Sequence, residues 1–308
     1  MDDYPKTLAE FEARFGNEQA CRDYLFAVRW PAGFHCPRCD HGVGWPVGAL
    51  LVQCAACNYQ VSVTAGTVFQ DTHKPLSTWF RAIWWVTSQK TGASALGLQR
   101  ILGLGSYKTA WTWLHKLRRA MVRPGRDRLA GRVEVDETYL GGLDEGRKGR
   151  PGADSHKATV VIAAEEDGKG IGRIRMRRIQ AASADLLGGF IADSVEPTSV
   201  IHTDGWNGYA ALPSKGYRHE VDLMKNDNTL LPRVHRVASL LKRWLLGTHQ
   251  GGVSREHLDY YLDEFTFRFN RRKSKYRGKL FARLLEQAVA VEPAPYRTII
   301  KHVRSTNH

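Results

Sequence analysis

Four of the five cysteines form two close pairs whose spacing suits a metal ion. Cys36 and Cys39 in CPRC, followed by Cys54 and Cys57 in CAAC, give the pattern C-x2-C-x14-C-x2-C. Each pair lets two thiolates from one tight turn reach the same ion, and two pairs complete a tetrahedral site. The pattern predicts structural Zn²⁺ in a zinc ribbon, because a full set of protein ligands leaves no open position for chemistry.

Disulfides explain these cysteines less well, because the N-terminal residues are acidic and polar and do not resemble a secretory signal. A single redox C-x-x-C would leave the second pair unexplained. His35 is surplus to a complete set of thiolates and is interpreted as a residue on the surface or behind the ligands. Cys21 is expected to be a small buried hydrophobic residue.

Two aspartates lie in segments with the residue pattern of strands. Asp136 belongs to GRVEVDETYLGG, in which apolar and acidic residues alternate, and Asp204 belongs to TSVIHTDG. Two carboxylates close together repel each other unless cations lie between them, and Mg²⁺ is the usual solution. Two such ions can activate an attacking oxygen and stabilise a leaving oxygen in phosphoryl transfer. Taken alone, either aspartate could be a cap or turn residue.

A histidine and a lysine share one side of the helix predicted over residues 231–251. His235 and Lys242 are seven residues apart, almost two helical turns, with only the small Ala238 and Ser239 between them on that side. A phosphate could enter this gap, with Lys242 as a point charge. We consider two roles for His235: a metal ligand, direct or through water, or a proton carrier. Mn²⁺ accepts nitrogen more readily than Mg²⁺ does. The alternative is an ordinary exposed helix residue.

Three other carboxylates could substitute for an acid at position 235. Glu137 is discounted because strand alternation directs it to the sheet face opposite Asp136. Asp263 and Glu264 belong to a later helical segment and are expected to form salt bridges with nearby arginines.

The elements that must position these residues follow a recognisable order. Three strand patterns at residues 131–142, 158–166 and 172–180 precede a helix at 183–195, a strand at 198–205 and a helix from 206. This order predicts an RNase-H-like mixed sheet, in which the first and fourth strands are neighbours and bring Asp136 and Asp204 together. The glycine-rich segment 141–157 is predicted to be a mobile hairpin loop.

The segment before this sheet has the pattern of a helix-turn-helix. A helix rich in tryptophan is expected from residue 74, and glycines in LGLGS separate two further helical patterns. In the last helix an apolar face made of Tyr107, Ala110, Trp111, Leu114, Leu117 and Met121 opposes a polar face made of Lys108, Thr112, His115 and Arg119. That arrangement suits a recognition helix on DNA, with Ser106 as N-cap, although a solvated amphipathic helix has the same pattern.

The formal net charge of +14 is concentrated in two parts of the chain. Residues 90–130 hold nine Lys/Arg against one acidic residue, and residues 266–308 hold eleven against two, while the rest is close to neutral. Two basic segments predict two surfaces for a polyanion, and nucleic acid is favoured over mere solubility. Arg243, Arg271, Arg272 and Lys273 are therefore predicted to contact DNA, together with the polar face of the helix-turn-helix. No apolar run is long enough to span a membrane.

The motifs together resemble the bacterial zinc-ribbon insertion-sequence transposases. The resemblance rests on CRDYLFAVRWPAGFHCPRCDH, SVTAGTVF, KTAWTWLHKLRRAM, VEVDETYLGG, HTDGWNGY and SLLKRWLLGTHQG, from about residue 5 to residue 300. It implies a ribbon, a helix-turn-helix and an RNase-H-like catalytic domain of the acidic-triad type. Asp136 is then similar to the first catalytic aspartate and Asp204 to the second. His235 occupies the place of a glutamate seven residues before the lysine, as in branches with asparagine or histidine there.

The sequence thus predicts a multidomain α+β or α/β chain: a zinc ribbon at 1–70, a helix-turn-helix region at 71–128, a catalytic domain at 129–265 and a basic helical tail at 266–308. The expected function is DNA transposition at terminal inverted repeats, with Mg²⁺ or Mn²⁺ at Asp136, Asp204 and His235. Expected partners are duplex DNA and a second copy or larger assembly, in the cytoplasm on the nucleoid and without a membrane. The alternatives are an inactive DNA-binding regulator and, less favoured, an RNA nuclease.

Overall fold

The computed structural model describes residues 3–123, 125–141, 157–222 and 230–301. The chain forms two compact units, one comprising residues 1–124 and 273–308 and the other residues 125–272. Helices from both sides of the second unit in sequence, such as α1 (Leu8–Arg14) and α9 (Gly278–Ala290), therefore belong to the same unit. This division differs from the four predicted segments, because the ribbon and helix-turn-helix regions share a unit and the predicted tail is split at residue 272.

The unit formed by the chain ends is helical apart from its ribbon. Its small antiparallel sheet has the order β1-β2-β3, with β1 at Gly44–Val47, β2 at Leu51–Cys54 and β3 at Gln60–Ser62. The helices are α1 (Leu8–Arg14), α2 (Glu18–Arg29), α3 (Leu76–Ser88), α4 (Ala95–Leu102), α5 (Tyr107–Ala120), α9 (Gly278–Ala290) and α10 (Tyr296–Ile300).

Helix α9 completes the core of this unit from the far end of the sequence. The ring of Phe281 lies 5.4 Å from that of Phe11 and 5.7 Å from that of Phe80, measured between centroids. At Gly278 a Cβ would lie 1.5 Å from the carbonyl oxygen of Pro5, so only glycine allows this approach of the two backbones. The segment after residue 272 is therefore structural as well as basic.

The second unit is built on a mixed sheet of five strands with the order β6-β5-β4-β7-β8. Neighbours β4–β5 and β5–β6 are antiparallel, whereas β4–β7 and β7–β8 are parallel. The strands are β4 (Arg132–Leu140), β5 (Ala158–Asp167), β6 (Gly170–Ile179), β7 (Val200–Asp204) and β8 (Arg218–Asp222). The first and fourth strands of this unit are neighbours, as an RNase-H-like order requires.

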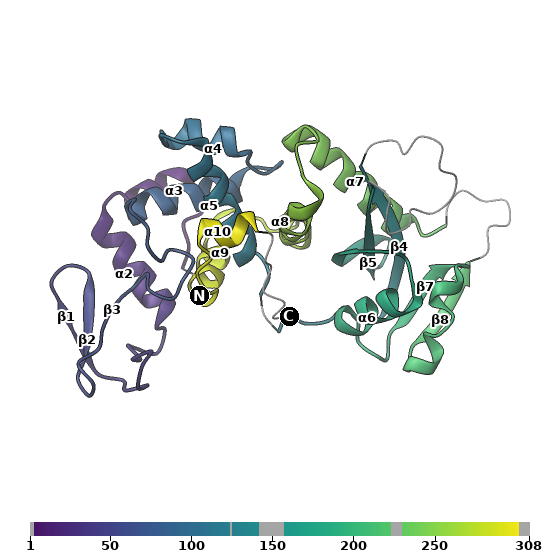
Figure 1. The fold of residues 1–308 in the computed structure, drawn as a ribbon, viewed down its shortest axis with the longest axis horizontal. Coiled ribbons are helices and arrows are strands. Elements are labelled where there is room, and N and C mark those ends of the chain that lie inside the picture. The colour runs from purple at the N-terminus through teal and green to yellow at the C-terminus, as the bar shows by residue number, and fades with distance from the viewer. Residues whose placement is uncertain (1–2, 124, 142–156, 223–229, 302–308) are drawn as a thin grey trace. The chain divides into compact units, whose positions relative to one another are not determined.

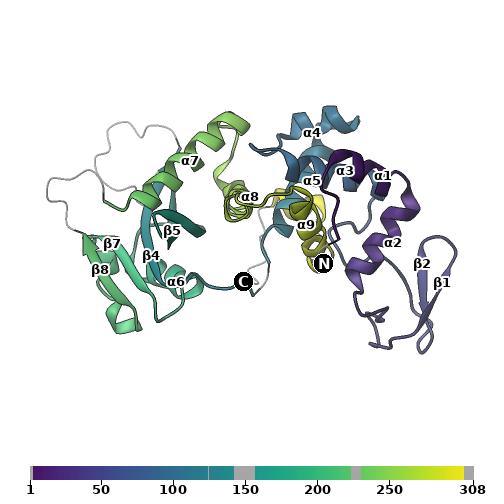
Figure 2. The ribbon, with the colours of Figure 1, turned by 180° about the vertical axis from the view of Figure 1, so that it is seen from behind.

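Helices cover both faces of this sheet (Figures 1 and 2). Helix α6 (Ala184–Ser194) packs with Val161 of β5 on one face, while α7 (Pro232–His249) and α8 (Leu258–Asn270) pack with Val160 and Ile162 on the other. Because β5 is apolar on both faces, it anchors two cores. The α7 face carries Asp136, since Asp136 pairs with Ile162.

Two predicted features of this unit differ from the structure. Residues 206–212 were expected to begin a helix, but only short 3-10 turns occur there, at Asn207–Tyr209 and Pro213–Lys215. Strand β8 was not predicted. The loop predicted at 141–157 lies almost entirely outside the described residues. Within the described ranges, no helix is both long and apolar enough to cross a bilayer.

Candidate active site

Asp136 lies in the middle of β4 and faces α7. Its side chain is 17% exposed, and its Oδ1 accepts a hydrogen bond of 2.8 Å from the backbone N–H of Glu137. Burial raises the pKa of Asp136 above its ordinary value, and the negative charge of Asp204 acts in the same direction, against the Glu137 N–H and His235. A buried carboxylate beside another negative charge is a site where a cation is favourable.

Asp204 ends β7, the parallel neighbour of β4. The pairing aligns Val133 with Ile201 and Glu134 with His202, and continuing this register by two residues places Asp204 level with Asp136. The Oδ1 atom of Asp204 accepts the backbone N–H of Trp206 at 3.1 Å, so the aspartate also forms the turn of HTDGW. The predicted juxtaposition of the two strands is confirmed.

His235 reaches Asp136 from the first turns of α7. Its Nε2 lies 3.1 Å from Oδ2 of Asp136, and its side chain remains 54% exposed. Lys242, also exposed, follows two turns later, with Ala238 buried and Ser239 exposed between them. His235 therefore contacts Asp136 directly, and Asp204 lies at the end of the adjacent strand β7.

The substitute carboxylates are engaged elsewhere. The hydroxyl of Tyr209 donates to Oε1 of Glu137 at 2.6 Å on the α6 face, as strand alternation predicts. Burial, followed by the charge of Glu137, raises the pKa of Tyr209 well above its ordinary value. Glu264 is fully buried and pairs with Nε of Arg268 at 2.8 Å, so its predicted salt bridge is confirmed.

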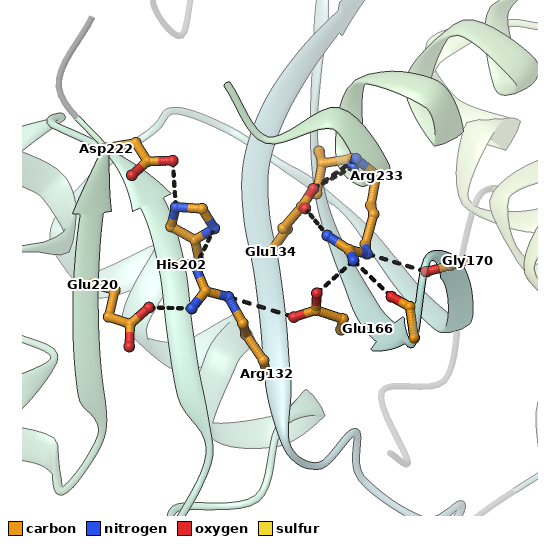
Figure 3. A network of polar contacts seen from close by, with 10 residues as sticks. Arg132, Glu134, Glu166, Gly170, His202, Glu220, Asp222 and Arg233 are labelled. Carbon is orange, nitrogen blue, oxygen red and sulfur yellow. Dashed lines mark hydrogen bonds and ion pairs between the residues drawn. The ribbon is translucent and has the colours of Figure 1, made fainter. Parts of the chain in front are cut away.

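Sequence reasoning missed a charged network around Glu134 and Arg132 (Figure 3). Glu134 of β4 binds the first turn of α7 through Arg233, and Arg132 connects Glu166 with Glu220. On the neighbouring strands Nε2 of His202 lies 2.7 Å from Oδ2 of Asp222. The period-two alternation of β4 places Glu134 on the same face as Asp136 and was the available signal, but it does not reveal the partners.

The four cysteines come together as predicted. Their sulfur atoms all lie within 4.8 Å of one another, and within the described parts of the chain no other group of three or more Cys, His, Asp or Glu meets this criterion. The Sγ atoms of Cys39 and Cys57 are 3.4 Å apart, and those of Cys36 and Cys57 are 3.7 Å apart. A tetrahedron with Zn–S bonds of about 2.3 Å has edges of about 3.8 Å, so these thiols fit Zn²⁺.

The local backbone explains this geometry. Asp40 and Asn58 each follow the second cysteine of a pair and adopt positive φ values of 60° and 56°, which close the two turns. Burial would raise the pKa of Cys54, but the backbone N–H groups of Cys57 and Ala56 lower it to about 6. Thiolate is the form that binds zinc. Cys21 is fully buried, as expected.

The predicted recognition helix is present as α5, with Ser106 as its N-cap, but its polar face needs correction. His115 is fully buried, so its assignment to a DNA-facing surface is wrong. Trp113 rather than Trp111 is the buried tryptophan and stacks on Trp79, with ring centroids 3.7 Å apart. Tyr107, assigned to the apolar back, is 53% exposed.

Of the other residues predicted to contact DNA, some are exposed and some pack against neighbouring side chains. Lys108 lies over the ring of Tyr296, and Thr112 donates to the carbonyl of Lys108, while Arg119 is half-buried. Arg243 and Lys273 are exposed. Arg271 stacks on Phe267, and Arg272 stacks on Phe269 and donates to backbone carbonyls of Ile171 and Gly172.

Comparison with known proteins finds a match in part of each unit. Residues 16–60 match the family described as transposase zinc-ribbon domain, and residues 128–270 match the family described as ISXO2-like transposase domain. These two segments are therefore similar to a transposase zinc ribbon and to an ISXO2-like transposase domain, and on this similarity we call residues 128–270 the transposase domain. The ribbon match contains all four cysteines, and the transposase domain contains Asp136, Asp204, His235 and Lys242.

A relative supports this assignment. The chain is 27% identical over 277 residues to an uncharacterized protein in the transposable element ISH50 of Halobacterium salinarum, with 82% of this chain and 91% of the relative covered. A solved structure of the simian T-cell lymphotropic virus intasome, in complex with a PP2A regulatory subunit, is similar at a TM-score of 0.36 and 18% identity. That similarity covers 59% of this chain and 70% of that one.

The donor atoms of the transposase domain suit a hard divalent cation. Asp136 and Asp204 supply carboxylate oxygens from adjacent strands, and repulsion between them contributes to the raised pKa of Asp136. A divalent cation would relieve that repulsion, and oxygen ligands are those that Mg²⁺ and Mn²⁺ prefer. The two carboxylates are therefore of the kind that binds such an ion, but the ligand atoms of Asp136, Asp204 and His235 are not all within 4.8 Å of one another, as those of the four cysteines are.

Proposed function

We propose that this protein is an active DNA transposase, which binds the terminal inverted repeats of its insertion sequence, cleaves DNA and joins the freed 3′-OH to target DNA. The observation that carries the proposal is the 3.1 Å contact between Nε2 of His235 and Oδ2 of Asp136, next to Asp204 on the adjacent strand. This contact supports the proposal because it sets an imidazole directly against the carboxylate that would hold the cation.

In this proposal Asp136 and Asp204 hold Mg²⁺ or Mn²⁺. A cation held there would help to activate the attacking oxygen and to stabilise the leaving oxygen of the phosphodiester. His235 is placed either to complete the ligand set or to carry a proton beside Asp136, and its exposed ring leaves a path for solvent protons. Lys242 holds a backbone phosphate as a point charge.

The remaining surfaces would hold the element ends. The zinc ribbon and helices α4 and α5 would bind the inverted repeats, with Lys108, Thr112 and Arg119 rather than the buried His115. Arg243 and the basic run Arg271–Lys273 would follow DNA backbone. Since two ends must be held together for transposition, we propose a homodimer or larger assembly on nucleoid DNA in the cytoplasm.

The test is metal-dependent nicking of a duplex that carries the inverted repeat flanking the gene. Wild-type protein should nick it with Mg²⁺ or Mn²⁺, and Asp136→Ala and Asp204→Ala should each lose the activity while still binding the duplex. Glu196→Gln, an exposed acid of the same unit, serves as the control. If the wild-type protein binds the repeat without nicking in either metal, the chain is a DNA-binding regulator and the enzymatic proposal fails.

A further inference from the structure

Glu134 is a buried carboxylate that accepts hydrogen bonds from the start of α7. It is 2% exposed. Its Oε2 accepts backbone N–H groups of Arg233 at 2.7 Å and Val234 at 3.0 Å, and its Oε1 accepts the guanidinium of Arg233 at 2.8 Å (Figure 3). A charge so deeply buried is costly unless it is fully bonded, and these three donors supply the bonds.

Helix α7 needs this carboxylate because it lacks a cap of its own. Its N-cap residue is Leu231, with φ at 49° and no side-chain hydrogen bond, and Pro232 has no N–H to offer. The first backbone donors of the helix are therefore Arg233 and Val234, and Glu134 accepts both. A negative charge there is also favourable to the helix dipole.

Arg233 extends the attachment to a second strand. Its guanidinium also pairs with Glu166 of β5 and donates to the carbonyls of Gly168 at 2.9 Å and Gly170 at 3.0 Å. The first turn of α7 is thus fixed to β4, to β5 and to the turn between β5 and β6.

His235 is the next residue after this attachment. Glu134 and Asp136 are two residues apart on one face of β4, and Val234 and His235 are adjacent on α7. The same strand therefore holds both the start of the helix and the carboxylate that Nε2 of His235 contacts at 3.1 Å. A shift of the helix start would move the imidazole away from Asp136.

We propose that Glu134 is a positioning residue for the active site, which sets His235 against Asp136 by capping α7. The inference rests on the proposed function, because it assigns Glu134 a role in cleavage through His235. If Glu134 served stability alone, its substitution would have the same effect on the domain whether or not His235 is present.

The position of the His235 ring gives a readout that does not depend on activity. In full-length protein containing ¹⁵N-histidine, Glu134→Gln should move the Nε2 resonance of His235 toward that of a solvated imidazole. Glu166→Gln is the matched control, because it removes a carboxylate from the same guanidinium and leaves the backbone amides capped. An unchanged His235 resonance in Glu134→Gln would overturn the proposal. If that variant does not fold, Glu134→Asp is judged by the same criterion.

A double-mutant cycle tests the functional part. Glu134→Gln should reduce metal-dependent nicking by about 10- to 100-fold, the range seen when a residue that orients an active-site ligand is lost. In the His235→Ala background the same substitution should change the rate less than about twofold, since coupled residues are not additive. An equal loss in both backgrounds would show a merely structural cap. If the wild-type protein does not nick DNA, the proposed function is contradicted. The His235 resonance in Glu134→Gln then tests by itself whether Glu134 positions the ring.

Discussion

At the scale of single residues, the histidine at position 235 gives the site one negative charge fewer than a glutamate would. A glutamate at position 235 would add a third negative charge beside Asp136 and Asp204, whereas a neutral imidazole adds none. The residue is half exposed, so it can be replaced without a large packing cost.

Substitution of His235 is expected to change the metal preference. His235→Glu should lower the Mg²⁺ concentration that gives half-maximal nicking by about tenfold or more, because a carboxylate oxygen is a better Mg²⁺ ligand than imidazole nitrogen. His235→Ala should lose about 100-fold or more in rate if the ring carries a proton. Nicking rates over Mg²⁺ and Mn²⁺ titrations measure both, with Leu246→Ala, exposed at the far end of α7, as the control. Wild-type rates for His235→Ala in both metals would contradict any catalytic role.

The site shows how far single residues could be predicted. Alternation along β4 correctly separated Asp136 from Glu137, and the order of the elements correctly predicted that β4 and β7 are neighbours. The contact of His235 could not be predicted, because spacing along a helix gives a direction but not the rotation of the helix over the sheet. In our proposal that rotation depends on Glu134 and Arg233, which lie 99 residues apart in sequence.

At the scale of elements, the β5–β6 hairpin should give the transposase domain an acid-sensitive stability. Burial would raise the pKa of Glu165, but Arg173 and the N–H groups of Ala130 and Arg173 lower it overall. The unfolded chain then takes up a proton at higher pH than the folded chain does. Stability is therefore present above the ordinary glutamate pKa and is lost as pH falls below it, between about pH 5 and pH 3. Calorimetry should show a shallower acid decline of the thermal midpoint for Glu165→Gln than for wild type or Glu196→Gln, and parallel declines would refute the assignment.

Elements that meet distant parts of the chain were the hardest to predict. The polar face expected on α5 was derived from that helix alone, yet α9 and α10 also contact α5, and His115 is buried. Strand β8 was not predicted because RHEVD lies at the sheet edge, is polar, and lacks the apolar alternation of a half-buried strand. By contrast, the ribbon was predictable because its ligands are close in sequence and of one type.

At the scale of the whole molecule, the chain leaves its first unit at residue 124, builds the transposase domain, and returns at residue 273. The returning helix α9 puts Phe281 among the rings of Phe11, Phe15, Phe80 and Trp84. Helix α9, within the predicted basic tail, is therefore part of the core of the unit that also contains the ribbon. Helix α9 buries Phe281 in this core, while basic side chains such as Arg283 remain exposed.

Phe281→Ala should accordingly destabilise the unit made by the chain ends and leave the transposase domain intact. Removal of a fully buried phenylalanine typically costs about 3–5 kcal/mol. Hydrogen exchange should therefore quicken in peptides from α1 and α3, while peptides from β4, β5 and β7 keep their protection. Arg283→Ala on the exposed side of the same helix is the matched control and should change neither set. If the transposase domain lost protection to the same extent, the two units would unfold as one, and α9 could not be assigned to the first unit alone.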